Sequence, residues 1–138
     1  MRSALATSAV VTVDAAVAVG YALAVVYPTA GNLGGGGFMT VRLADGTTTF
    51  LDFRERALLA ATKDMYLGPD GNPIPGASTE TYLAVGTPGS VAGFEMAREK
   101  YGTRPREELL APAIRLASEG FVLEQGDIAS LAEGNERL

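Results

Sequence analysis

The fold is organised around residues 31–55, which read GNLGGGGFMTVRLADGTTTFLDFRE. Its four consecutive glycines lack Cβ atoms, so the backbone there can approach another group closely or adopt a positive φ. Two apolar runs follow, Phe38–Leu43 and Thr47–Glu55, with Asp45-Gly46 between them. An Asp-Gly pair between two apolar runs is a strong signature of a β-hairpin. We therefore predict two antiparallel strands directly after the glycine run.

A two-residue turn at Asp45-Gly46 fixes the strand register by counting outward, and it pairs Gly37 with Arg54. Because strand side chains alternate, one face of the second strand then carries Phe50, Asp52 and Arg54. This register places the guanidinium beside the glycine run, where no side chain opposes it. Such a space suits a carboxylate ligand. The alternative is a structural ion pair of Arg54 with Asp52 or Glu55, and the residues alone leave both interpretations open.

The segment before the glycines predicts a helix over Ala4–Val26 that is apolar nearly all round and therefore buried within something larger. Pro28 is expected to end it. Met1-Arg2 followed by small apolar residues is also compatible with a secretion signal. Against that alternative, Asp14 interrupts the apolar core. The run Ala15–Tyr27 is shorter than the about 20 residues that a bilayer requires, so we predict a buried helix.

The rest of the chain alternates short apolar runs with Gly and Pro breaks. The expected elements are helical turns at Ala57–Met65, a surface loop at Gly68–Ser78, a short strand at Tyr82–Val85, and helices at Val91–Lys100, Arg106–Ser118 and Gln125–Ala132. Thr87 or Ser90 is expected to cap the first of these helices, and Gly120 to close the second.

Composition excludes several classes of function. A length of 138 residues allows at most one domain. The net charge of −5, with scattered Lys and Arg, disfavours nucleic acid. The chain has no His and no Cys, so it offers no Ser-His-Asp triad and no thiolate metal site. The glycine run is followed by Phe38-Met39 rather than Lys-Ser/Thr, and a helix precedes it, so it does not predict a nucleotide site.

Five motifs occur in an order that resembles the N-terminal part of the large subunit of γ-glutamyltransferases, also called glutathione hydrolases. They are VDAAVA (13–18), GNLGGGGFM (31–39), DFRE (52–55), GTPGSVAG (86–93) and LAPAIRLA (110–117). The resemblance extends from about Val13 to the C-terminus.

This resemblance implies an α+β fold, a partial αββα sandwich of the N-terminal-nucleophile hydrolase type. It implies a precursor that cleaves itself into a large and a small subunit. The new N-terminal Thr of the small subunit attacks the γ-glutamyl amide of glutathione and related compounds, and its α-amine serves as the base. The glutamyl group then passes to water or to an amino acid or peptide. No metal or cofactor is implied, and the family is typically periplasmic or secreted.

Arg54, in DFRE, matches the family arginine that binds the α-carboxylate of the substrate. The glycine run and Thr87-Pro88-Gly89 match scaffold motifs. No catalytic residue is expected here, because no stretch resembles the Thr segment, the oxyanion-hole glycines or the small-subunit residues. The sequence departs from the family at residues 10–12, where Gly-Gly-Asn is usual, and at Leu58, where proline is usual.

We therefore expect residues 1–138 to be a single incomplete domain, with residues 1–12 atypical, that needs the remainder of the large subunit and the small subunit. Alone it is expected to be inactive and poorly stable, with open sheet edges. Two alternatives stay open: a non-enzymatic module that binds glutamate or γ-glutamyl peptides through Arg54, and a structural remnant without a ligand.

Overall fold

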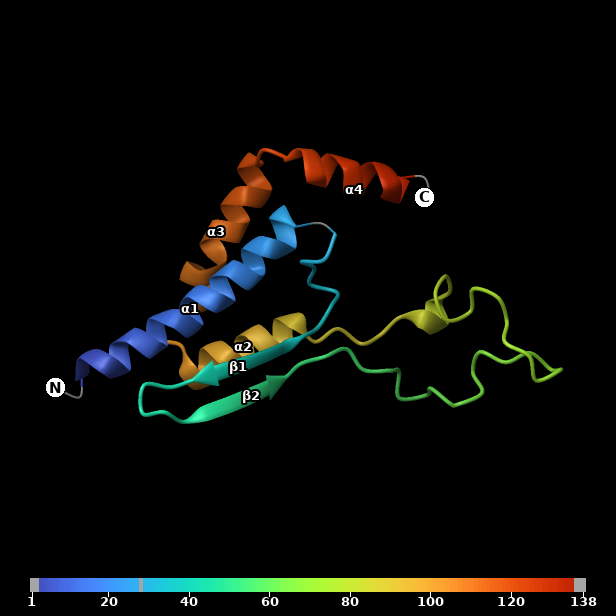
Figure 1. Ribbon diagram of the computed structural model, residues 1–138, viewed down its shortest axis with the longest axis horizontal. Helices are drawn as coiled ribbons and strands as arrows, with labels where there is room; N and C mark the ends of the chain where they lie inside the picture. Colours follow the sequence, from blue (N-terminus) through green and yellow to red (C-terminus); the bar gives the residue numbers. More distant parts are fainter. Residues whose placement is uncertain (1–2, 28, 136–138) are drawn as a thin grey trace.

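The computed structural model describes residues 3–27 and 29–135, and the side chains of residues 12–27 and 29–132. Its elements are α1 (Ser3–Val26), β1 (Phe38–Arg42), β2 (Thr48–Asp52), the 3₁₀ helix η1 (Tyr82–Ala84), α2 (Ser90–Tyr101), α3 (Arg106–Glu119) and α4 (Gln125–Asn135). Figure 1 shows α1 packed between α3 and α2, the hairpin of β1 and β2 beside α2, and a long arm between β2 and α2 that projects away from them. The chain thus mixes helices and strands, as predicted.

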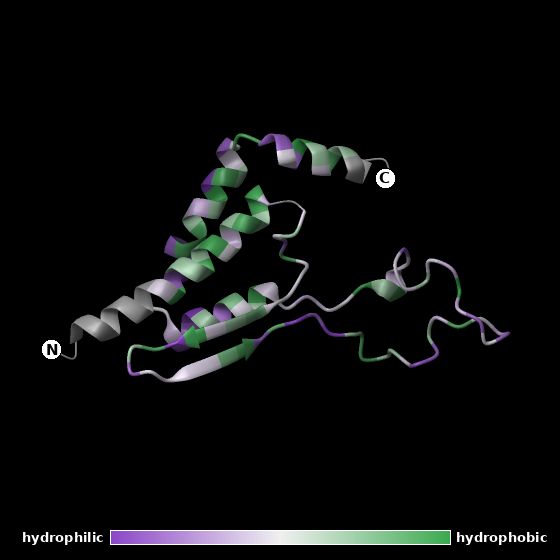
Figure 2. Cartoon of the chain, viewed as in Figure 1, coloured by the Kyte–Doolittle hydropathy of each residue, from purple (hydrophilic) through white to green (hydrophobic). Residues whose placement is uncertain are grey.

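The core lies between α1, α2, α3 and one face of the hairpin. Figure 2 shows hydrophobic residues along α1 and α3, which pack against each other. The buried apolar side chains of this core are Val13, Val17, Tyr21, Val41, Leu51, Ala97, Leu109 and Ala113.

The predicted helix forms as α1, but only one of its faces is buried. Val13, Val17 and Tyr21 are four residues apart and share a face, and they are 4%, 0% and 6% exposed. Val19 and Leu23 lie outside this face and are 54% and 40% exposed. Within the described residues no segment covers the second face, so burial of this face within a larger protein stays a prediction.

The end of α1 at Val26 agrees with the sequence. Pro28, expected to end the helix, lies outside the described residues. Among the helices of the described residues, none combines the length and the hydropathy needed to cross a membrane.

Asp14 anchors α1 to the link between α2 and α3. Its side chain is only 5% exposed. The backbone N–H of Thr103 donates to Oδ1 at 3.0 Å, and the Thr103 hydroxyl donates to Oδ2 at 2.8 Å. The backbone N–H of Arg104 also donates to Oδ1, at 3.4 Å. The polar residue that interrupts the apolar run is thus a buried and well-partnered acceptor.

The hairpin forms with a turn one residue longer than predicted. Leu43 N–H donates to the carbonyl oxygen of Thr47 at 2.8 Å, so three residues, 44–46, make the loop. Gly46 adopts a φ of +89°, and no non-glycine residue of the described chain has a positive φ. A two-residue type I′ turn requires positive φ at both central positions, including Asp45. Asp45 instead accepts the Thr47 N–H with its carboxylate at 2.8 Å.

The predicted register is therefore wrong by one residue. Gly37 pairs with Phe53 rather than with Arg54, through backbone hydrogen bonds of 3.0 and 3.3 Å. The predicted alternation along the second strand is confirmed, because Leu51 is 4% exposed whereas its neighbour Phe50 is 59% exposed.

The predicted helices after the arm form as α2, α3 and α4, with a correction to the start of α2. Gly89 occupies the N-cap position, and no side chain caps the helix. Neither Thr87 nor Ser90 is the cap, and the Ser90 hydroxyl donates to the carbonyl oxygen of Asn32 at 3.3 Å instead. Gly120 closes α3 with a φ of +82°, as predicted.

The arm, residues 53–89, has less regular structure than predicted. Ala57–Met65 forms turns rather than a helix, and the expected strand at Tyr82–Val85 is replaced by η1. The loop at Gly68–Ser78 is confirmed. Short helices derive most of their stability from packing, and Leu59 in this region is fully exposed. The turns of the arm therefore lack a surface that would stabilise a helix.

Candidate carboxylate-binding site

The glycine run connects the hairpin to the start of α2. The carbonyl oxygen of Gly35 accepts the backbone N–H groups of Gly89, at 2.9 Å, and Ser90, at 3.0 Å. A Cβ on Gly89 would clash with the carbonyl oxygen of Phe53. The glycines permit this close approach of three segments and thereby place Arg54, the next residue after Phe53, beside the run.

Arg54 is exposed and its guanidinium has no carboxylate partner. Within the described part of the chain, no carboxylate oxygen lies within 4 Å of its side-chain nitrogens. The alternative ion pair with Asp52 or Glu55 is therefore absent. The carboxylate of Asp52 accepts the backbone N–H of Arg54 instead, at 3.1 Å. The N–H donors of the guanidinium are available to a ligand.

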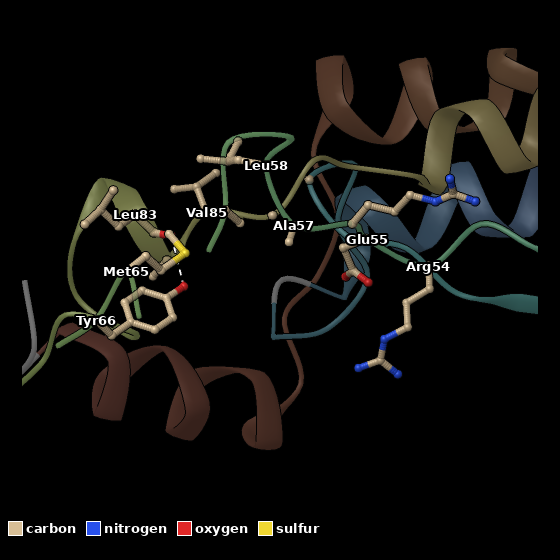
Figure 3. A pocket seen from close by; sticks show the side chains of 13 residues that line it. Arg54, Glu55, Ala57, Leu58, Met65, Tyr66, Leu83 and Val85 are labelled. Carbon is tan, nitrogen blue, oxygen red and sulfur yellow. Dashed lines mark hydrogen bonds between the residues drawn. The ribbon is translucent and has the colours of Figure 1, made fainter. Parts of the chain in front are cut away.

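Arg54 and Gly34 line a common cleft of about 460 Å³. Figure 3 shows Arg54 and Glu55 at one end of this cleft, and Tyr66 and Leu83 at the other. The Tyr66 hydroxyl donates to the carbonyl oxygen of Leu83 at 3.1 Å and ties the two sides of the arm together. The predicted register is wrong by one residue, but Arg54 still lies beside the glycine run, as predicted.

The two ends of the cleft differ in chemistry. Arg54 and Glu55 make one end charged, whereas Met65 and Leu83 contribute apolar surface at the other, and Leu58 and Val85 lie between them (Figure 3). A fork of N–H donors at one end of an elongated cleft suits a small molecule that carries a carboxylate.

Sequence reasoning found Arg54 but missed Tyr66 and Arg56, which also line the cleft. Neither belongs to a motif with a local signal. Their positions depend on how the arm folds back, since Arg56 bridges to Thr87 through backbone hydrogen bonds of 2.7 and 3.2 Å.

The described residues offer no grouping of three or more His, Cys, Asp or Glu side chains that would hold a metal ion.

Away from the cleft, a charged cluster around Glu95 connects the helices α1, α2 and α3. Glu95 accepts hydrogen bonds from the Tyr21 hydroxyl at 3.1 Å and from Arg98 Nε at 2.9 Å, and Arg106 Nη2 lies 2.8 Å away. The hydrogen bond from Arg106 is the main cause that lowers the pKa of Glu95, and desolvation opposes it. Burial, followed by the hydrogen bond to Glu95, raises the pKa of Tyr21. These contacts join α1, α2 and α3.

Residues 9–138 match the family model described as gamma-glutamyltranspeptidase. The chain is 71% identical over 119 residues to the glutathione hydrolase proenzyme of Pseudomonas sp. (strain A14), which covers 86% of this chain and 21% of that protein. It is 58% identical over 111 residues to the proenzyme of Escherichia coli (strain K12), covering 80% of this chain and 19% of the relative. The chain thus spans about a fifth of the length of these curated relatives.

Solved structures give the same relationship. The gamma-glutamyltranspeptidase of Helicobacter pylori superposes with a TM-score of 0.87 at 46% identity, over 99% of this chain and 42% of that one. The gamma-glutamyltranspeptidase of Pseudomonas nitroreducens, complexed with L-DON, superposes with a TM-score of 0.83 at 42% identity, over 94% of this chain and 40% of that one. This chain belongs to the gamma-glutamyltranspeptidase family.

Proposed function

We propose that this chain is the part of a γ-glutamyltransferase, or glutathione hydrolase, that binds the α-carboxylate of the γ-glutamyl group. The carrying observation is Arg54, an exposed arginine that lines a cleft beside the glycine run and has no ion-pair partner among the described residues. The names of the relatives support glutathione as the substrate. The reaction cleaves the γ-glutamyl amide and transfers the glutamyl group to water or to an amino acid or peptide.

The nucleophile belongs to another part of the protein in this proposal. An N-terminal Thr, released when the precursor cleaves itself, attacks the amide, and its own α-amine takes the proton. The word proenzyme in the names of the relatives supports such processing. The isolated chain is then inactive, and its partners are the remainder of the large subunit and the small subunit.

The same proposal extends to the sandwich architecture. The face of the hairpin that is turned away from the helices carries Phe38 and Phe50, which are 53% and 59% exposed. Large aromatic side chains on one sheet face favour burial against a second sheet. We place the second layer of the αββα sandwich there. Export to the periplasm or the medium, supported by the family resemblance, is tested by fractionating cells that produce the protein.

The experiment uses a chimera in which the matched 119-residue segment of this chain replaces the corresponding segment of the Pseudomonas sp. (strain A14) relative. The chimera is expected to release glutamate from glutathione. It should act much more slowly on an analogue whose γ-glutamyl α-carboxylate is converted to the neutral amide.

Equal rates on the two substrates would contradict carboxylate recognition. Glutamate release by the isolated chain would contradict the division of roles. An inactive isolated chain that binds free glutamate in titration calorimetry, combined with an inactive chimera, would favour the non-enzymatic module.

A further inference from the structure

We propose that Phe38 is a positioning residue for Arg54, and that its ring holds the guanidinium in the orientation that receives the carboxylate. This inference rests on the proposed function. It assigns to the first residue after the glycine run a role in ligand binding rather than in packing alone.

The strand register places the two side chains on one face of the hairpin. Phe38 pairs with Asp52, so residues 50 and 54 lie on its two diagonals. Diagonal neighbours on an antiparallel pair are within reach of aromatic and long side chains. The Phe38 and Phe50 rings stack with centroids 5.6 Å apart and an interplanar angle of 21°. The guanidinium carbon of Arg54 lies 6.0 Å from the centroid of Phe38.

Asp52 contacts the backbone of Arg54 and not its guanidinium. This residue stands between Phe50 and Arg54 on the same strand face and would be the nearest anionic partner. Its Oδ1 instead accepts the backbone N–H of Arg54 at 3.1 Å. Among the described residues, the guanidinium faces the Phe38 ring and has no carboxylate within 4 Å.

The type of contact matters for function. A carboxylate partner would occupy the N–H fork of the guanidinium. A ring attracts the cation through its π face, and the N–H groups that lie in the guanidinium plane remain available to a ligand. Phe38 therefore restrains a long side chain without competing with the substrate. Restraint before binding reduces the side-chain entropy lost when the ligand arrives.

The test measures glutathione kinetics of the chimera with substitutions at Phe38. A cation–π contact at an exposed site contributes about 0.5–1 kcal/mol, which corresponds to a KM increase of about two- to fivefold. Phe38→Leu is expected to raise KM by this factor with kcat preserved. Phe38→Tyr, which keeps the π face, should restore KM.

Two matched Phe→Leu controls separate this contact from general loss of aromatic surface. Phe50→Leu removes the ring behind Phe38 without touching the guanidinium, and it should have a smaller effect on KM. Phe121→Leu, in the link between α3 and α4, should have no effect on KM. When the chimera already carries Arg54→Ala, the additional substitution Phe38→Leu should not raise KM further.

The outcomes distinguish the inference from the proposed function. If Arg54→Ala raises KM and Phe38→Leu does not, the positioning role is wrong and the proposed function stands. If Arg54→Ala leaves KM unchanged, the proposed function itself is wrong. If Phe38→Leu lowers kcat and the thermal midpoint together, and Phe38→Tyr does not restore KM, Phe38 is structural and the inference is overturned.

Discussion

Replacing Arg54 by alanine in the chimera tests the site most directly, because the structure separates its effect on binding from its effect on folding. The side chain is exposed, and its guanidinium has no ion pair within the described residues. The substitution removes the contact with the Phe38 ring, which contributes about 0.5–1 kcal/mol at an exposed site. The thermal midpoint of Arg54→Ala should therefore lie only slightly below that of the parent.

The loss in catalysis should be large by comparison. A hydrogen bond to a charged group contributes about 1.5–3 kcal/mol, and the guanidinium fork can donate two to one carboxylate. Because the cleft is partly open to solvent, the two hydrogen bonds together contribute less than their sum. We expect Arg54→Ala to lose about 2–4 kcal/mol of transition-state stabilisation, or about 30- to 700-fold in kcat/KM. Arg54→Lys, which keeps the charge but not the fork, should lie between alanine and the parent.

The assay compares glutathione with the analogue whose α-carboxylate is a neutral amide. The parent chimera should discriminate strongly between them, and Arg54→Ala should abolish most of this discrimination. Arg42→Ala is the matched control, because Arg42 is an exposed arginine of the same hairpin that does not line the cleft. Undiminished discrimination in Arg54→Ala, or equal losses in both variants, would refute carboxylate recognition by Arg54.

Three further predictions concern the scaffold of the chimera. Asp14→Ala removes the buried acceptor that holds the link between α2 and α3, and it should destabilise the protein by about 2–4 kcal/mol; thermal unfolding measures this, and an unchanged midpoint would exclude the anchor. Gly89→Ala should leave little soluble protein, because the new methyl group would clash with the Phe53 carbonyl oxygen, whereas Gly126→Ala has open space; equal soluble yields would contradict the close approach. The pKa of Glu95 is lowered in the folded protein, so its contribution to stability is present above its ordinary value of 4.5 and is lost as the pH falls through the lower folded pKa. As the pH falls from 4.5 through the lower folded pKa, the free energy of unfolding should therefore decrease less in Glu95→Gln than in the parent. An identical dependence of the unfolding free energy on pH in the two proteins would argue against this role.

Local sequence patterns predicted most of the elements but not their exact relations. The helix before the glycines, the hairpin, the helices at α2 and α3, and Gly120 as a helix terminator each depend on short-range chemistry, and each is confirmed. The register was wrong by one residue because Asp-Gly is compatible with two turn lengths. The backbone conformation of Asp45 decides between them.

In the arm, residues 53–89, local patterns did not predict all of the structure. Ala57–Met65 has enough apolar residues to suggest helical turns, yet it forms none in the described structure. A short helix needs a surface to pack on, and the sequence of the arm does not reveal that this surface is missing. The lining of the cleft by Tyr66 and Arg56 was unpredictable for the same reason.

The sequence by itself determined that a glycine run leads into a hairpin and that Arg54 follows close after it, since strand alternation and turn chemistry are local properties; the second strand itself ends at Asp52, three residues before the predicted end at Glu55. Only the tertiary structure decided that this arginine has no carboxylate partner among the described residues. The choice among Asp52, Glu55 and Phe38 as its neighbour depends on the register, which a one-residue difference in the turn changes. It also depends on the contact between Gly35 and Gly89, which joins parts of the chain far apart in sequence.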